Sequence, residues 1–372
     1  MASFQITGKL KAVKDKENFK GFEVRDFPAS GWQTTKLRFN VISGNNSFMV
    51  EIAGGKFTDD AKNKVIYTNS RPVNGDKSKS IQVDWKKRHD PATIKSVAGW
   101  RIYSVDLLDA NTRERMEAGT DEEIETAKTM KREYLEKTEF AEFIRDVIAN
   151  PDYQNAMFTI KGNVDFSYSA EKGEYYRTLS VDKINREADN AEPKAEMTLD
   201  AYYTADSIVR DSYDETKKYL FNCYTDYYFS NVKAKRFVPI GLVIDGSESD
   251  TIAKSWANKF SKFEDDATVR KASLVCTMLN GSQTQKITYD DLDDETKEDI
   301  GLGLITLEDA IRGLGGNMFG DRVTETRVRT YMTKRGNSKS TEPTAYSEDD
   351  LKIPPIPVSE AGTSADEDED DI

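Results

Sequence analysis

Basic side chains alternate with apolar ones along two stretches of the first fifty residues. In "TTKLRFNV" the apolar residues alternate with Lys36, Arg38 and Asn40. In "FQITGKLKAV" they alternate with polar residues that include Lys9 and Lys11. A period of two is typical of a strand with one buried face. Both stretches therefore predict strands that turn positive charge outward, which is the chemistry of a polyanion-binding surface.

Aromatic residues are interleaved with this charge. Single-stranded nucleic acid requires a positive groove that follows its phosphates and aromatic faces on which its bases stack. The residues predicted to provide these two functions are Lys9, Lys11, Trp32, Lys36, Arg38, Trp85, Lys86, Lys87, Arg88, Arg101, Tyr103 and Arg177. The alternative is that the cations only solvate the surface and the aromatic rings belong to the core. For the basic segment as a whole, the binding interpretation is favoured.

Charge is segregated along the chain, whose net charge is −13. Residues 1–103 contain 19 Lys or Arg against 10 Asp or Glu, whereas the last 25 residues contain 1 against 10. The chain closes on six consecutive carboxylates and one apolar residue: Asp366, Glu367, Asp368, Glu369, Asp370, Asp371 and Ile372. Like charges in such a run repel one another, so it is predicted to be a solvated interaction tail.

Other chemistry finds little support. A single histidine and two distant cysteines, Cys223 and Cys276, argue against His-based catalysis, a disulfide framework and a Cys-rich zinc site. The acidic "YDDLDDETKED" lacks the spacing of a calcium loop and is interpreted as the start of a helix. The glycine-rich runs "GLGL" and "GLGGNMFG" match no phosphate-binding motif. We therefore predict no enzyme activity, no cofactor and no metal.

The elements expected around these residues are mainly strands. About five short strands within residues 1–110 have the rhythm of a small antiparallel barrel such as an OB-fold. A capping box at Thr120 and Glu123 opens a helix that is predicted to run from Ile124 to Ile148. The frame "FQITGKL" at 4–10 returns as "FTIKGNV" at 158–164, which predicts a second β unit. A hairpin is expected across Asn280-Gly281.

The predicted fold class is mainly β with helical additions (α+β), with one or two OB-like barrels. The predicted divisions are a basic OB-like domain at 1–110, a connecting helix at 111–153, a second β domain at 154–245, an α+β region at 246–335 and a disordered acidic tail at 336–372. The last division rests on its prolines, its acidic charge and its few bulky apolar residues.

This combination resembles the single-stranded DNA-binding proteins of bacteria and their phages. The residues that carry the resemblance are the basic β segment 1–110, the linker "KIPPIPVSEAGTS" and the terminal "DEDEDDI". Ile372 departs from the aromatic or Pro-Phe end usual in that group, and the greater length looks more phage-like than bacterial. The resemblance implies non-specific coating of single-stranded DNA, and recruitment of replication or recombination proteins by the tail.

Neither a signal peptide nor a membrane-spanning segment is predicted, so the expected location is the cytoplasm, that of the host cell if a phage encodes the chain. Two other functions remain open. One is a β-rich phage structural or scaffold protein, which salt-dependent DNA binding would distinguish. The other is a nucleic-acid enzyme, which would show metal-dependent turnover.

Overall fold

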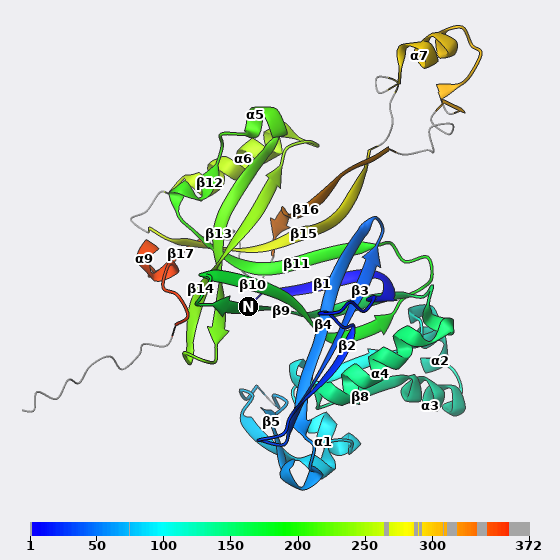
Figure 1. The fold of residues 1–372 in the computed structure, drawn as a ribbon, viewed down its shortest axis with the longest axis vertical. Helices are drawn as coiled ribbons and strands as arrows, with labels where there is room; N and C mark the ends of the chain where they lie inside the picture. The colour runs from blue at the N-terminus through cyan, green and yellow to red at the C-terminus, as the bar shows by residue number, and fades with distance from the viewer. Residues whose placement is uncertain are drawn as a thin grey trace, which may run out of the picture.

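The fold is mainly β with several short helices (Figure 1). The structure is a computed structural model and describes residues 2–73, 75–263, 268–285, 289, 292–307, 309–310, 318–332 and 341–356. Most of its strands belong to one continuous sheet. The predicted fold class is thus confirmed at the level of a strand-rich protein with helical additions.

Five strands form a closed set of pairings that we call the first strand circuit. They are β1 (Ser3–Ala12), β3 (Trp32–Ser43), β4 (Asn46–Phe57), β9 (Met157–Ser169) and β10 (Glu174–Arg186). β1 pairs with β3 and β9, β3 with β4, and β9 with β10, all antiparallel. A parallel pairing of β10 with β4, at Ser180 and Glu51, closes the circuit. Ile6, Phe39 and Ile52 are fully buried inside it.

A second strand circuit repeats this order. Its strands are β11 (Lys194–Tyr203), β13 (Lys218–Phe229), β14 (Ala234–Asp245), β15 (Arg270–Gln285) and β16 (Met318–Tyr331). β11 pairs with β13 and β15, β13 with β14, and β15 with β16, again antiparallel. A parallel pairing of β14 with β16, at Val243 and Arg327, closes it. In both circuits a helix lies in sequence between the third and fourth strands: α4 (Lys137–Ala149) and α6 (Asp250–Ser261).

The two circuits join through their first strands. Ser3–Thr7 of β1 pairs with Lys194–Thr198 of β11, and β15 meets β4 at Gly281 and Asn46. Peripheral elements extend this sheet or cap its edges: β2 (Phe22–Phe27), β12 (Ile208–Val209), α5 (Tyr213–Thr216), β17 (Glu342–Pro343) and α9 (Glu348–Leu351). The helix α7 (Asp294–Gly301) lies away from the sheet (Figure 1). The strand pairings therefore cross the predicted limits at 110, 153 and 245, because β9 and β10 complete the first circuit and β15 and β16 the second.

The repeated frame has an unexpected place. "FQITGKL" and "FTIKGNV" do not head separate units but lie side by side as antiparallel β1 and β9. The phenylalanine of each copy faces the glycine of the other: Phe4 opposes Gly162, and Gly8 opposes Phe158. A Cβ on Gly162 would lie 1.9 Å from the carbonyl oxygen of Ser180, so the tight curvature requires glycine there.

The helix predicted from Ile124 to Ile148 is wrong as a single element. The chain forms α3 (Asp121–Met130), then the strand β8 (Lys131–Tyr134), which pairs with β7 (Tyr103–Asp106), and then α4. The predicted capping box at Thr120 and Glu123 is present. Glu136 caps a new helix start by accepting from the backbone N–H groups of Thr138 and Glu139. Tertiary pairing here overrides the helix propensity of the individual residues.

The hairpin predicted across Asn280-Gly281 is also wrong, because β15 runs straight through both residues. Gly281 serves close approach instead of a turn. A Cβ at this position would lie 2.0 Å from the carbonyl oxygen of Asn45, in the tight turn that joins β3 to β4. The glycine thus lets the second circuit touch the first.

Residues 58–102 form a compact projection that we call the basic lobe. Its elements are η1 (Asp60–Lys62), β5 (Val65–Asn69), β6 (Ser80–Asp84), η2 (Trp85–Lys87), α1 (Pro91–Ser96) and η3 (Gly99–Arg101). β5 and β6 form a separate two-stranded sheet. Val83, Ile94, Val97 and Ile102 pack with Leu135 into a small core of their own. Two further helices, α2 (Ala110–Glu117) and α3, lie beside α4 (Figure 1).

Candidate nucleic-acid interface

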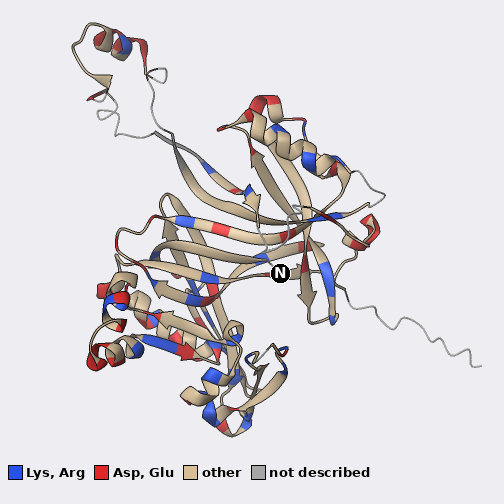
Figure 2. Ribbon diagram, turned by 180° about the vertical axis from the view of Figure 1, so that it is seen from behind, with Lys and Arg blue, Asp and Glu red and all other residues tan. Residues whose placement is uncertain are grey.

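The basic lobe holds much of the positive charge of the N-terminal segment. It contains 10 Lys or Arg against 5 Asp or Glu, and blue segments gather in it at the bottom of Figure 2. Nine of the cations are exposed, and none of these forms an ion pair with a described residue: Lys62, Lys64, Arg71, Lys77, Lys79, Lys86, Lys87, Lys95 and Arg101. Uncompensated cations on one small surface are free to neutralise phosphates.

Hydrogen bonds to the backbone occupy several acidic groups of the lobe. Asp84 accepts from the N–H of Lys86 at the start of η2, and Asp59 accepts from Ala61. Asp90 caps α1 by accepting from Ala92 and Thr93. The bonds from Thr93 lower the pKa of Asp90, because they favour the ionised carboxylate. These carboxylates thus fix the local fold and form no ion pairs with the neighbouring lysines in the part of the chain described.

The lobe also exposes two aromatic rings that the sequence analysis missed. Tyr67, on β5, is 73% exposed and Trp100, in η3, is 59% exposed. The segments that carry them are joined by backbone hydrogen bonds from Ala98 to Asn69 and from Arg71 to Ser96. The β-branched and aromatic run "VIYTN" favours a strand, and in β5 Thr68 is buried while Tyr67 is exposed. No pattern marked Trp100, which precedes Arg101 in the short helix η3.

The aromatic residues that were predicted to stack are mostly packed. Trp85 is buried at 8% exposure, with the Arg88 guanidinium 4.4 Å from its ring centroid. Tyr103 stacks on Phe140 at 6.0 Å, and burial raises the pKa of its hydroxyl to about 12. For these two residues the structure favours the alternative interpretation, a role in the core.

Trp32 is half-buried at the start of β3. Its ring lies edge-on to Phe57 at 5.0 Å and covers Gly55, where a Cβ would approach the ring to 2.5 Å. Thr58, at the start of the lobe, donates its backbone N–H to the carbonyl of Gly31. The turn before Trp32 therefore adjoins the lobe.

The predicted basic strand faces divide into free and neutralised groups. Lys9 and Lys11 are exposed on β1 and form no ion pair with a described residue. Arg38, in contrast, donates to Glu51 at 3.0 Å and lies 3.5 Å from Glu23. Lys36 also lies 3.8 Å from Glu51. The outer face of β3 is thus close to charge balance, which sequence alternation alone does not reveal.

The other predicted cations are placed as follows. Lys86 and Lys87 project from η2 into solvent, whereas Arg88 forms an ion pair with Glu139 of α4 at 2.9 Å. Arg101 is exposed and donates to the side-chain oxygen of Asn69. Arg177 lies outside the lobe, on β10, where it lines a pocket between the two circuits. The predicted tail residues, Asp366 to Ile372, lie outside the described residues.

The metal-ligating side chains and the cysteines are placed as follows. Within the described part of the chain, no group of three or more His, Cys, Asp or Glu side chains could hold a metal ion. Asp293 caps α7 by accepting from the N–H of Thr296. Cys223 and Cys276 are free and buried, and burial raises the pKa of both thiols. None of the helices described is long and apolar enough to cross a membrane.

Comparison with known proteins gives little guidance. No family model matches the chain, and the curated proteins contain no significant match. Among solved structures, a deletion mutant of the single-stranded DNA binding protein from Thermus aquaticus is similar to this chain at 7% identity and a TM-score of 0.31. The match covers 75% of this chain and 87% of that one. A TM-score of this size is too low to define a common fold.

Proposed function

We propose that this protein binds single-stranded DNA without sequence specificity. The observation that carries the proposal is the basic lobe, which combines nine exposed cations without ion pairs to described residues with the exposed rings of Tyr67 and Trp100. Cations that track phosphates and rings that stack on bases are the two requirements of non-specific single-strand binding. Neither the phosphate contacts nor the stacking depends on the recognition of a base edge, so neither is specific for sequence.

The strand circuits support the same proposal. We propose that each circuit is an OB-type barrel of five strands, a fold that binds oligonucleotides on its second and third strands and on the loops beside them. In the first circuit these strands are β3 and β4, and the lobe follows β4 directly. The turn at Gly31, between the first and second strands of the circuit, bonds to the first residue of the lobe. The lobe thus adjoins the region that such a barrel uses for binding.

The proposal extends to the biological setting. A phage origin, a role in replication or recombination, a cytoplasmic location and no enzymatic activity fit the charge distribution and the resemblance noted in the sequence. The acidic tail would recruit partner proteins with basic pockets. These statements rest on the sequence, since the terminal residues 366–372 lie outside the described residues.

A gel-shift assay tests the binding function. The full chain is mixed with labelled oligo-dT, with duplex DNA and with RNA of equal length, at roughly 50 and 200 mM salt. We expect oligo-dT to be retarded at low salt, to be preferred over duplex, and to lose affinity steeply as salt rises, because counterions are released from the phosphates. No retardation of oligo-dT at low salt, or a preference for duplex, would overturn the proposal.

A further inference from the structure

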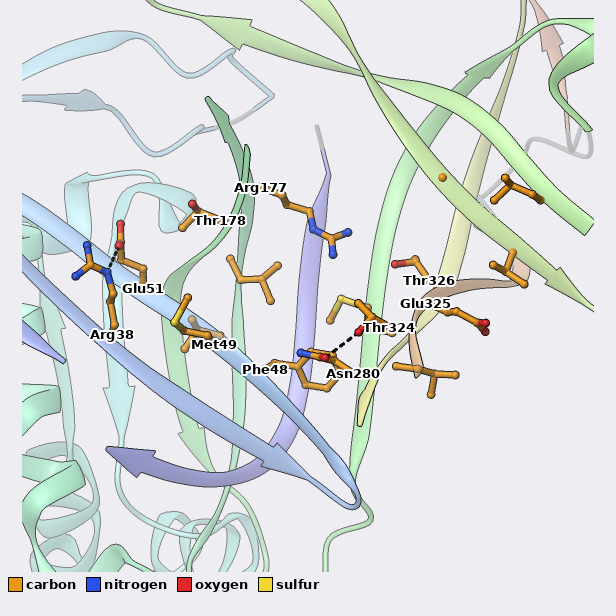
Figure 3. Close-up of a pocket in the computed structure, with 17 residues that line it drawn as sticks. Arg38, Phe48, Met49, Glu51, Arg177, Thr178, Asn280, Thr324, Glu325 and Thr326 are labelled. Atoms are coloured by element: carbon orange, nitrogen blue, oxygen red, sulfur yellow. Dashed lines mark hydrogen bonds and ion pairs between the residues drawn. The ribbon is translucent and has the colours of Figure 1, made fainter. Parts of the chain in front are cut away.

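A pocket of about 400 Å³ lies between the two strand circuits, away from the basic lobe (Figure 3). Its walls come from β3, β4 and β10 on one side and from β13, β14, β15 and β16 on the other. A volume of this size lies within the range of small-ligand sites. Both circuits contribute walls to the pocket, so neither circuit would form it alone.

Among the described residues around this pocket, one cation has no charged partner. Glu51 is neutralised by Arg38, and Glu325 by Lys218 at 2.6 Å and by Arg327 at 2.8 Å. Arg177 forms no ion pair or hydrogen bond with a described residue. Figure 3 shows its guanidinium directed across the space toward Thr326 and Asn280. The pocket therefore presents an uncompensated positive charge.

The Arg177 side chain is accessible to solvent, but it lies in the concave wall of the pocket with protein around it. Desolvation there lowers the pKa of its guanidinium, which nevertheless stays protonated near neutral pH. A cation that has lost part of its hydration without gaining a carboxylate is stabilised by an anionic ligand. Its planar fork of N–H donors matches the oxygens of a phosphate.

Apolar surface completes the pocket. Met49 of β4 is 52% exposed and Leu220 of β13 is 42% exposed, and both lie in its lining. Thr178 and Thr326 add hydroxyl groups. An anion-binding guanidinium beside an apolar wall and hydroxyl groups suits a ligand that combines a phosphate with a flat, partly polar ring.

The geometry points to a binding site for one nucleotide unit of a single strand, with its phosphate on Arg177 and its base against Met49 and Leu220. This inference rests on the proposed function. The path to the lobe is direct, because β4 carries Met49 in the pocket and ends at Phe57 beside the lobe. Phe57 follows Met49 by eight residues, which at about 3.3 Å per residue is a distance of roughly 26 Å along β4. A DNA strand that runs along the outer face of β4 would reach both the pocket and the basic lobe.

The test compares Arg177→Gln with Lys172→Gln in the full chain. Lys172 lies in the turn of the same β9–β10 hairpin, is exposed and lies outside the pocket lining, so its replacement removes the same charge without touching the site. With oligo-dT of about 30 nucleotides, we expect Arg177→Gln to weaken binding about tenfold and Lys172→Gln less than twofold, since a hydrogen-bonded charge contributes more than a screened surface charge. Arg177→Lys should restore only part of the loss, because it keeps the charge but not the fork.

A second readout locates the ligand. Oxidative footprinting of the bound protein should protect Met49 but not Met332, which is 36% exposed at the end of β16 and is absent from the pocket lining. Deoxythymidine monophosphate alone should protect Met49 more than thymidine does. Equal losses in Arg177→Gln and Lys172→Gln, or an unprotected Met49 in a protein that binds oligo-dT, would refute the pocket site and leave the proposed function standing. Wild-type protein that binds no oligo-dT would refute the proposed function itself.

Discussion

Two arginines that look equivalent in the sequence have different environments in the fold. Arg38 and Arg177 both follow the alternation of a strand, and both were predicted to bind nucleic acid. Arg38 is held by Glu51 and Glu23, whereas Arg177 has no charged partner among the described residues. Alternation predicts which face a residue occupies, but not whether a carboxylate from another strand neutralises it.

Tyr67 and Trp100 are expected to contribute directly to binding. Replacing either residue with alanine should weaken oligo-dT binding by about 1–3 kcal/mol, the usual contribution of base stacking. Because both rings are exposed, the melting temperature should hardly change. Fluorescence anisotropy with labelled oligo-dT measures the effect. Tyr228→Ala is the matched control, since Tyr228 is 50% exposed on β13, outside the lobe; equal effects of all three substitutions would contradict the assignment.

Trp85 should behave in the opposite way. Its ring is buried, so Trp85→Ala should destabilise the lobe by up to about 3–5 kcal/mol through loss of a large core side chain. Limited proteolysis of the variant should then cut within residues 58–102 before the strand circuits. A variant as protease-resistant as the wild type, but deficient in DNA binding, would return Trp85 to the stacking role that the sequence suggested.

At the scale of elements, hydrophobic periodicity correctly predicted the strands and helices whose buried side chains follow that period. The strands "FQITGKLKAV" and "TTKLRFNV" are present as β1 and β3, and the stripe of Phe140, Ile144 and Val147 faces the core from α4. The failures share one cause. The strand β8 and the continuous β15 depend on partners remote in sequence, β7 and β16, which no local period encodes.

Gly281 offers a test of the junction between the circuits. A methyl group there would collide with the backbone of Asn45, so Gly281→Ala should cost about 1–3 kcal/mol, as overpacking does. Gly241→Ala on β14 is the control, because its Cβ would meet only Leu220 at an ordinary 3.8 Å. Urea unfolding measures both variants. If Gly281→Ala is as stable as Gly241→Ala, the close approach of β15 to the β3–β4 turn is not present in solution.

At the scale of the whole molecule, charge is divided between a basic lobe and an acidic end. Deleting residues 364–372 removes six carboxylates without touching the described elements, so thermal stability should not change. Binding of oligo-dT should tighten as the tail ceases to compete for the basic lobe. At about 0.15 M salt the Debye length is about 8 Å, so a gain that persists there indicates direct competition by the tail. Unchanged affinity in anisotropy titrations would leave the tail without a role in binding.

The salt dependence of binding tests the central claim most directly. Anisotropy titrations across a salt series give the slope of log affinity against log salt. Three proteins are compared: the wild type, a lobe variant that combines Lys86→Gln with Lys87→Gln, and a control variant that combines Lys172→Gln with Lys233→Gln in two turns outside the lobe. All four lysines are exposed, and none is ion-paired to a described residue. Each lost phosphate contact should reduce the slope by about 0.7, so the lobe variant should lose about 1.4 and the control almost nothing. Equal slopes for the two variants would contradict the proposed function of the lobe, because the DNA strand would then be bound elsewhere.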